Sequence, residues 1–182
     1  MSHNNEIQVL DRTFVPYISA GDISAAVKRI AGEIERDYAG REPFFLGILT
    51  GAFMFAADLF RQISIPSTIR FMQLSSYKAM ASTGDVKEVL CLNDDITGRH
   101  IVVIEDIVDS GTTMHHLVPD LLAKGAASVE ICSLLFKPDA LLHEDVRPRY
   151  IGFNIPRDFV IGYGLDYDGY ARNLPAIYVL KP

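Results

Sequence analysis

Apolar residues follow two alternating patterns along the chain, one typical of helices and one typical of buried strands. Residues 22–38 have helical spacing, with Ser19 or Asp22 as the candidate N-cap and Gly40 as a stop signal. The apolar positions of this predicted amphipathic helix are Ile23, Val27, Ile30 and Ile34. Residues 43–51 follow as a short apolar run that ends at a glycine, which is typical of a buried strand.

The same alternation continues through the middle of the chain. Residues 53–63 predict a helix and residues 65–77 a strand, whereas the small and polar residues 78–88 predict a mobile loop or a loosely paired hairpin. Residues 100–126 predict a strand, a tight loop and a helix, and residues 128–137 predict a further strand. Strands that alternate with helices indicate an α/β fold, in which helices flank a central, mostly parallel, twisted sheet.

The C-terminal part of the chain has a different pattern. Residues 147–182 contain short strand-like pieces broken by glycine and proline, and we expect them to form a small hood-like appendage over the sheet. The length of 182 residues suits one domain, so we expect a single domain over residues 1–182. Its core is expected at about residues 20–146, with N-terminal residues joining the appendage.

Charge and composition exclude several classes of function. The chain has 17 Lys and Arg against 23 Asp and Glu, a net charge of −6, which disfavours a nucleic-acid partner. No apolar run reaches the ~18 residues that a membrane span needs, and the N-terminus has no signal-peptide pattern. We therefore expect no membrane partner. Cys91 and Cys132 lie among apolar residues and predict inert thiols in a reducing compartment, which points to the cytoplasm.

Histidine spacing disfavours a zinc site. No pair among the five histidines has the HxxxH or HExxH spacing of zinc enzymes. His115 and His116 are adjacent, so on a helix their side chains would point about 100° apart.

The most informative chemistry lies in residues 101–113. A buried strand is predicted at Ile101–Ile104, with the acids Glu105 and Asp106 at its carboxyl end, and a loop leads into a helix that begins near Thr113. The loop residues Asp109, Ser110, Gly111, Thr112 and Thr113 combine hydroxyl donors with a glycine that permits close backbone approach. A helix N-terminus in this position predicts a phosphate-binding site. The chain has no P-loop or dinucleotide-binding glycine motif.

Two acids beside a phosphate loop would repel the phosphate unless they face another group. Glu105 and Asp106 therefore predict contact with sugar hydroxyls, as of a ribose, or with a divalent cation. The alternative interpretation is that these two residues and Asp109 are solvated loop acids that cap the following helix.

This segment resembles the phosphoribosyl-diphosphate-binding motif of the type I phosphoribosyltransferases, in which two acids after a strand precede Asp-Ser/Thr-Gly-x-Thr. Four further blocks resemble the hypoxanthine or hypoxanthine-guanine phosphoribosyltransferases. They are LTGAFMFAADL, SSYKAMASTGDVK, LLFKP and FVIGYGLDYDGYARNLP, and with the motif they cover about residues 44–182 in the family's order. The resemblance implies Mg²⁺-dependent transfer of a 5-phosphoribosyl group from phosphoribosyl diphosphate to a 6-oxopurine, in purine salvage.

The resemblance also implies roles on the phosphate side of the site. Asp109 would be the general base at the purine N7, with helix N-capping as its structural alternative. The residues Ser110, Gly111, Thr112 and Thr113 would bind the 5′-phosphate, and Glu105 and Asp106 would face the ribose and Mg²⁺. Thr50 and Gly51 match the family's pyrophosphate loop, which contains a non-proline cis peptide, although many relatives carry Lys or Arg where this chain has Thr50.

Other roles implied by the resemblance concern the purine, the metal and the closing loop. Lys137 would donate to the purine 6-oxo group, Phe159 would stack on the ring, and Val160 would offer backbone groups to its edge. The alternative interpretation of Lys137 is an exposed lysine without a specific role. The alternative for Phe159 and Val160 is that they are residues of the hydrophobic core. Arg172 would contact pyrophosphate and Asp166 would bind Mg²⁺, with Asp168 as the competing assignment. Ser76 and Tyr77 match a flexible loop that closes over the reacting groups.

Two other functions remain open at this level. The same fold could serve as a non-catalytic phosphoribosyl-diphosphate sensor that regulates nucleotide metabolism, or the acids could serve a metal-dependent hydrolase, although the latter lacks a clear ligand cluster. The family leads us to expect a homodimer or homotetramer. The sequence leaves the preference among hypoxanthine, guanine and xanthine open.

Overall fold

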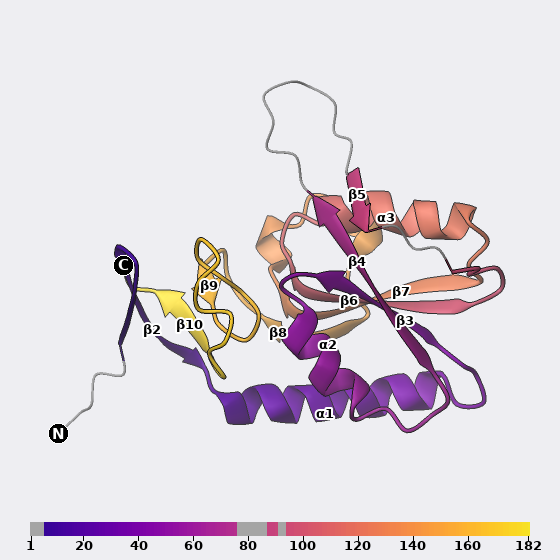
Figure 1. The fold of residues 1–182 in the computed structure, drawn as a ribbon, viewed down its shortest axis with the longest axis horizontal. Helices are drawn as coiled ribbons and strands as arrows, with labels where there is room; N and C mark the ends of the chain where they lie inside the picture. The colour runs from indigo at the N-terminus through magenta and orange to yellow at the C-terminus, as the bar shows by residue number, and fades with distance from the viewer. Residues whose placement is uncertain (1–5, 76–86, 91–93) are drawn as a thin grey trace.

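The larger of two sheets forms the centre of the molecule in the computed structural model, which describes residues 6–75, 87–90 and 94–182 (Figure 1). Its six strands lie in the order β5-β4-β3-β6-β7-β8. Neighbouring strands are parallel except for β5, which is antiparallel to β4. The strands are β3 (Phe44–Leu49), β4 (Thr68–Ser75), β5 (Lys87–Leu90), β6 (His100–Val108), β7 (Ser128–Phe136) and β8 (Tyr150–Asn154). The predicted α/β class with a mostly parallel sheet is confirmed.

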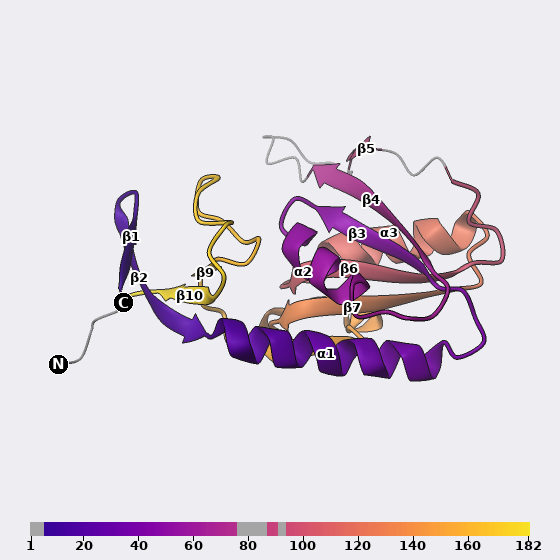
Figure 2. The ribbon, with the colours of Figure 1, turned by 60° about the horizontal axis from the view of Figure 1, so that its bottom comes forward.

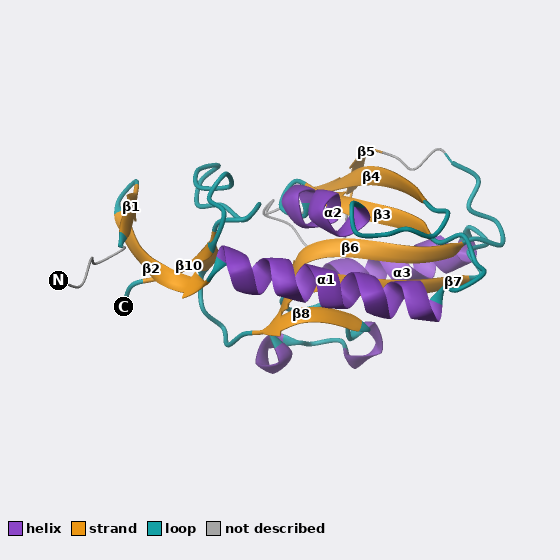
Figure 3. Cartoon of the chain, turned by 90° about the horizontal axis from the view of Figure 1, so that it is seen from below, coloured by secondary structure: helices purple, strands orange, loops and turns teal. Residues whose placement is uncertain are grey.

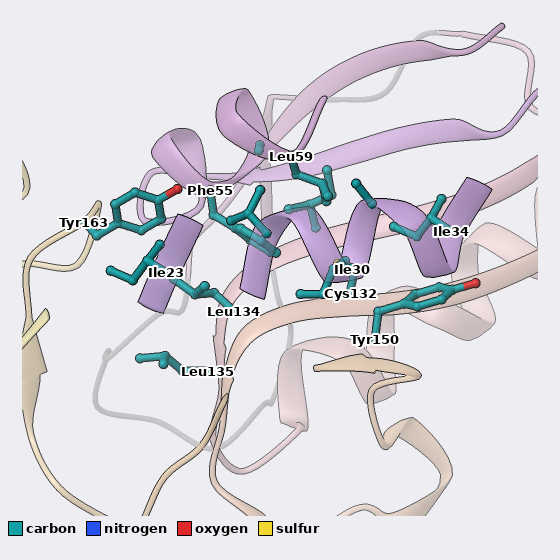
Figure 4. Packing of buried hydrophobic residues seen from close by; sticks show 14 of the residues in the cluster. Ile23, Ile30, Ile34, Phe55, Leu59, Cys132, Leu134, Leu135, Tyr150 and Tyr163 are labelled. Carbon is teal, nitrogen blue, oxygen red and sulfur yellow. The ribbon is translucent and has the colours of Figure 1, made fainter. Parts of the chain in front are cut away.

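Helices cover both faces of this sheet. Helices α1 (Ala20–Asp37) and α2 (Phe53–Phe60) pack on one face, and α3 (Thr112–Ala123) packs on the other (Figure 3). Alternating side chains in β3 supply both cores, since Phe45 packs with residues of α1 and α2 while Phe44 and Leu46 pack with residues of α3. Figure 4 shows the first core, with Ile23, Ile30 and Ile34 of α1 beside Phe55 and Leu59 of α2. None of the helices in the described ranges is both long and apolar enough to cross a membrane.

The first residue of α1 follows from local chemistry. Ser19 is the N-cap, and its Oγ accepts the Asp22 backbone N–H at 3.1 Å, so the first of the two candidate caps is confirmed. Six buried side chains then repeat at helical spacing, namely Ile23, Ala26, Val27, Ile30, Ala31 and Ile34. This stripe packs on the sheet and holds the helix against it.

A second, antiparallel sheet combines both ends of the chain in the hood. Its strand order is β1-β2-β10-β9, from β1 (Ile7–Val9), β2 (Arg12–Ile18), β9 (Val160–Ile161) and β10 (Ile177–Leu180). Figure 2 shows this hood at the side of the molecule toward which the arrowheads of β3 and β4 point. The carboxyl ends of the main sheet therefore face the hood, which is where ligands bind in open α/β sheets.

One boundary predicted from the sequence is wrong. The sequence predicts that the appendage begins at residue 147, but β8 (Tyr150–Asn154) is an edge strand of the main sheet, paired in parallel with β7. Tyr150 is buried, and its hydroxyl donates to Asp37 Oδ2 at the end of α1 at 2.8 Å. Two short 3₁₀ helices, η1 (Pro138–Ala140) and η2 (Glu144–Val146), connect β7 to β8. The glycines and prolines that suggested a separate unit begin to dominate only after β8.

Candidate active site

A cavity of about 320 Å³ lies at the carboxyl ends of β3 and β6, beside the N-terminus of α3. It is lined by most of the residues that the sequence singled out on the phosphate and metal side. These are Thr50, Gly51, Glu105, Asp106, Asp109, Ser110, Gly111, Thr112, Thr113, Asp166 and Arg172. Segments far apart in the sequence therefore converge on one polar cavity.

The two acids lie within strand β6 and not after it, which corrects the predicted strand end at Ile104. The alternation of buried side chains changes phase between them, because Ile104 and Ile107 both pack on the α1 side while Val108 faces α3. Ser133 of the neighbouring strand bridges this irregularity, since its Oγ accepts the Val108 N–H at 3.2 Å. Both Glu105 and Asp106 line the cavity as a result.

Burial changes the acidity of this pair. It raises the pKa of Glu105 well above the usual value, and the neighbouring Asp106 carboxylate raises it further. Burial also raises the pKa of Asp106, although the Ile107 N–H, which donates to Oδ1 at 2.8 Å, and the charge of Arg172 oppose the shift. Two neighbouring half-buried carboxylates repel each other when both are charged, so a proton or a cation bound between them is favoured. Their interpretation as solvated caps of the helix is wrong.

The turn after β3 approaches these acids closely. The Leu49–Thr50 peptide bond is cis, as the resemblance implied. A Cβ on Gly51 would overlap the Asp106 carboxylate, and a Cβ on Gly164 would overlap the Gly51 carbonyl oxygen. Only glycine at these two positions lets the turn contact both the strand acid and the hood.

The loop before α3 brings the first turn of the helix to the cavity. Gly111 is the N-cap of α3 with φ +80°, a left-handed conformation that favours glycine, and the helix begins at Thr112. The Ser110 Oγ accepts the Thr112 N–H at 3.3 Å. Asp109 does not cap the helix, so its carboxylate is available for other contacts.

Lys137 and Asp109 form an ion pair that sequence spacing did not predict. The Lys137 Nζ donates to Asp109 Oδ2 at 3.0 Å across 28 residues of chain. The lysine is only 8% exposed, whereas the Asp109 side chain is about half exposed toward the cavity. The Lys137 N–H also donates to the Val108 carbonyl at 3.0 Å, which fixes the lysine beside the end of β6. The interpretation of Lys137 as a freely exposed lysine is wrong.

Asp166 and Arg172 form a second ion pair, at 2.8 Å, at the hood side of the cavity. The Arg172 Nη1 donates to the Gly164 carbonyl at 2.6 Å, and Asp166 Oδ2 accepts the Gly169 N–H at 2.7 Å. These bonds aim both side chains at the cavity, whereas Asp168 is exposed on the adjoining turn. The geometry favours Asp166 over Asp168 as the candidate metal ligand.

Two of the predicted purine residues, Phe159 and Val160, lie in the hood, just before and within β9. Phe159 is 46% exposed, and its ring packs at 6.2 Å from Phe14 and at 5.9 Å from Tyr167, edge to face with the latter. The Val160 side chain is buried in β9, so only its backbone groups could meet a ligand. Phe159 and Val160 do not line the cavity described above. Ser76 and Tyr77 lie outside the described residues.

Sequence reasoning missed some lining groups. Ile107, Val108 and Met114 also line the cavity, and all three pack in the hydrophobic cores of the sheet as well. The two ion pairs were missed as well, because each joins residues that the resemblance assigned to separate tasks. The sequence did contain one signal for these pairs, because each joins an acidic and a basic residue that were both predicted to lie in the same site.

Comparisons with known proteins agree with this geometry. The chain matches the family model "Phosphoribosyl transferase domain" over residues 19–168. It is 40% identical over 172 residues to the hypoxanthine-guanine phosphoribosyltransferase of Mycobacterium tuberculosis strain H37Rv, with 91% of this chain and 85% of that protein covered. The corresponding enzyme of Streptococcus pneumoniae strain R6 is 41% identical over 165 residues, with 90% and 91% covered.

A solved structure extends the likeness to three dimensions. The crystal structure of a hypoxanthine-guanine phosphoribosyltransferase from Bacillus anthracis matches with a TM-score of 0.86 at 38% identity, covering 91% of this chain and 98% of that one. The chain therefore belongs to the phosphoribosyltransferase family. The relatives named above are hypoxanthine-guanine phosphoribosyltransferases, and the resemblance stated from the sequence is confirmed.

Proposed function

We propose that this protein transfers the 5-phosphoribosyl group of phosphoribosyl diphosphate to hypoxanthine, and also to guanine, in purine salvage. The products are the nucleoside monophosphate and pyrophosphate. The observation that carries the proposal is the convergence, on one cavity, of a phosphate-type helix N-terminus, a carboxylate pair and Asp109, whose carboxylate pairs with Lys137. Relatives at about 40% identity with this named activity support it.

The Asp109–Lys137 pair matches two neighbouring atoms of a 6-oxopurine. In such a ring O6 accepts hydrogen bonds and N7 carries or receives a proton, so Lys137 can donate to O6 while Asp109 holds the proton at N7. The purine N9 attacks the anomeric carbon of the ribose, the C–O bond to pyrophosphate breaks, and the N7 proton passes to the Asp109 carboxylate. Adenine presents a donor at position 6 and would leave Lys137 without an acceptor.

The remaining residues of the cavity suit the anionic part of the substrate. The backbone N–H groups and hydroxyls of residues 110–113 bind the 5′-phosphate at the start of α3. Thr50 and Gly51, through their backbone, and Arg172 bind the pyrophosphate. Glu105 and Asp106 accept hydrogen bonds from the ribose hydroxyls.

The donor set also suits Mg²⁺. Three carboxylates from Glu105, Asp106 and Asp166 line the cavity, and oxygen ligands are those that Mg²⁺ prefers. Burial raises the pKa values of Glu105 and Asp106 because it disfavours their charged forms. A bound cation would stabilise those charged forms. When bound, Mg²⁺ offsets the charge that develops on the leaving pyrophosphate.

Three further points belong to this proposal. We propose that residues 1–182 act as one catalytic domain, in which the hood supplies the purine side through Phe159 and Val160. We also propose that the enzyme forms a homodimer or homotetramer and works in the cytoplasm. Its substrates are small molecules, and neither nucleic acid nor membrane is a partner in the reaction.

A substrate panel tests the proposal directly. The purified full chain is assayed with phosphoribosyl diphosphate, Mg²⁺ and, in parallel, hypoxanthine, guanine, xanthine and adenine, with pyrophosphate release and nucleotide formation as readouts. We expect turnover of hypoxanthine and guanine and little turnover of adenine. Tight binding of phosphoribosyl diphosphate without turnover of any purine would instead support the sensor interpretation.

A further inference from the structure

A second cluster of ligand-type side chains lies outside the cavity described above. His115 of α3 faces His143 and Asp145 from the connection between β7 and β8. The His115 Nδ1 lies 2.9 Å from Asp145 Oδ2, and the two imidazole rings stack with their centroids 4.0 Å apart. One potential ligand atom from each of the three side chains lies within 4.8 Å of the other two.

The backbone around the cluster is well fixed on both sides. The His115 N–H donates to the Gly111 carbonyl at 2.9 Å in the first turn of α3. Across from it, Val146 is buried against α3, and its N–H donates to the His143 carbonyl at 3.3 Å. Two rigid supports therefore present the three side chains to one another, while the side chains themselves are half-buried or exposed and free to adjust.

The ligand chemistry differs from that of the active-site acids. Two imidazoles and one carboxylate are a donor set for Zn²⁺ and similar transition metals, whereas Mg²⁺ selects oxygen ligands. Ligand bonds of about 2.0–2.2 Å in a tetrahedral site place the ligand atoms about 3.3–3.5 Å apart. Because the three ligand atoms lie within 4.8 Å of one another, they need to move closer by at most about 1.5 Å to meet this geometry, which rotation of exposed side chains supplies.

We propose that His115, His143 and Asp145 form a second metal site, which takes a divalent transition metal of the Zn²⁺ type with water in the open position. Zinc motifs in sequences rely on ligands that lie a few residues apart, whereas His115 and Asp145 are 30 residues apart. Such a motif therefore does not identify this site. Its ligands come together through the tertiary fold.

The bound metal would brace the phosphate loop. The connection that carries His143 and Asp145 lies against Gly111, since a Cβ there would meet Leu141 Cδ1 at 2.8 Å and Val146 Cγ2 at 3.0 Å. The Leu142 N–H also donates to the Ser110 carbonyl at 2.9 Å. A metal that joins this connection to α3 therefore restrains the loop from behind, away from the substrate.

Metal binding to the untagged full chain is the first test. Calorimetric titration with Zn²⁺, in buffer with excess Mg²⁺ to occupy carboxylate sites, is expected to show one site per chain. Co²⁺ in its place should give the visible absorption of a site with nitrogen ligands. Both signals should be lost in His115→Ala and His143→Ala and kept in His116→Ala, the matched control, whose ring lies 5.6 Å from that of His115 but outside the cluster.

Thermal unfolding gives a second readout. At a free Zn²⁺ concentration about 100 times Kd, Tm should rise by about 5–10 °C in the parent chain and in His116→Ala. The rise should be absent from His143→Ala, whose own fold is checked by its Tm without metal. Zn²⁺ binding that persists in both cluster variants, or an absence of stoichiometric binding to the parent chain, would overturn the proposal.

Discussion

The phosphate side of the active-site cavity is built mostly from one stretch, residues 105–113, and from the turn at Thr50 and Gly51, and the hood adds Asp166 and Arg172. The proposed purine side instead draws on separate side chains that do not line this cavity, with Lys137 after β7, Phe159 before β9 and Phe14 from β2 packed against Phe159. A polyanion can be bound by backbone N–H groups, which any sequence supplies once the turn is correct. A base must be recognised by chosen side chains, so its site depends on tertiary contacts between distant segments.

The two sides also differ in electrostatics. Half-buried carboxylates with raised pKa values dominate the phosphate side. The purine side combines a half-exposed aromatic ring with the nearly buried ammonium of Lys137. Asp109 joins the two, because it follows β6 on one side and pairs with Lys137 on the other. Substitutions at the residue that joins the two sides should therefore have larger effects than substitutions on one side.

Asp109→Asn, at the junction of the two sides, should have the largest effect. The amide keeps the size of the side chain but cannot hold the N7 proton, so we expect kcat to fall by about 10²–10⁴-fold. The KM for phosphoribosyl diphosphate should change little, because the backbone of residues 110–113 is unaltered. Steady-state kinetics with both substrates measures the two effects separately.

Asp168→Asn is the matched control for this substitution. It makes the same chemical change on an exposed turn of the hood, where φ is +50° and asparagine is well tolerated. Its kcat should stay within about twofold of the parent value. If Asp109→Asn turned over at a near-normal rate, Asp109 would not be the general base.

Lys137→Gln tests the recognition of position 6 of the purine. A hydrogen bond from a charged donor contributes about 1.5–3 kcal/mol, so kcat/KM for hypoxanthine should fall by about 10–150-fold. The preference for hypoxanthine over adenine should shrink at the same time, while the KM for phosphoribosyl diphosphate stays constant. Competition between the two purines provides the measurement, and Lys28→Gln on the exposed face of α1 is the control. A preference that survives the change would remove Lys137 from the selection of position 6.

Glu105→Gln tests the carboxylate pair through stability. Because the folded pKa of Glu105 lies above its ordinary value of 4.5, the folded chain keeps a proton that the unfolded chain loses as the pH rises above 4.5. The free energy of unfolding of the parent chain should therefore fall as the pH rises above 4.5. Glu105→Gln has no carboxyl group at this position, so its free energy of unfolding should not fall for this reason. We expect the Tm of the variant to exceed that of the parent by a few degrees at neutral pH.

Glu35→Gln is a control of opposite sign. Hydrogen bonds from the Ser64 hydroxyl and N–H, both at 2.6 Å, lower the pKa of Glu35, so its contribution to stability is present above pH 4.5 and lost on acidification. Its variant should be less stable than the parent at neutral pH and converge with it in acid. Equal behaviour of the two variants would show that burial does not dominate at Glu105.

Much of the fold could be predicted because local signals agreed with the tertiary outcome. The stripe from Ile23 to Ile34, the apolar run of β3 and the stretch around Gly111 each have a periodicity or turn chemistry that specifies their element. The assignment of β8 failed because a strand at the edge of the sheet carries the same short apolar signal whichever sheet it joins. Pairing with β7 is a long-range contact that periodicity does not encode.

The candidate site divides along the same line. Residues 105–113 could be predicted as a group because they are contiguous, whereas the Asp109–Lys137 and Asp166–Arg172 pairs form only when separate segments meet. The extension of β6 through Glu105 and Asp106 was missed because acids usually end a buried strand. Their burial is tolerated because the neighbouring N–H group and Arg172 partly offset the charge.

Thr50→Lys should have the smallest effect on the kinetics. It tests whether backbone groups or side chains bind the pyrophosphate on the phosphate side. Thr50 is exposed beside Gly51, in the position where the resemblance would allow Lys or Arg. If backbone groups carry the pyrophosphate, an added ammonium contributes only an exposed ion pair of at most about 1 kcal/mol, so KM should fall by no more than about fivefold. Thr50→Ala should leave the KM for phosphoribosyl diphosphate within about twofold of the parent. A larger gain in Thr50→Lys, or a clear loss in Thr50→Ala, would mean that side chains and not the backbone dominate binding on the phosphate side.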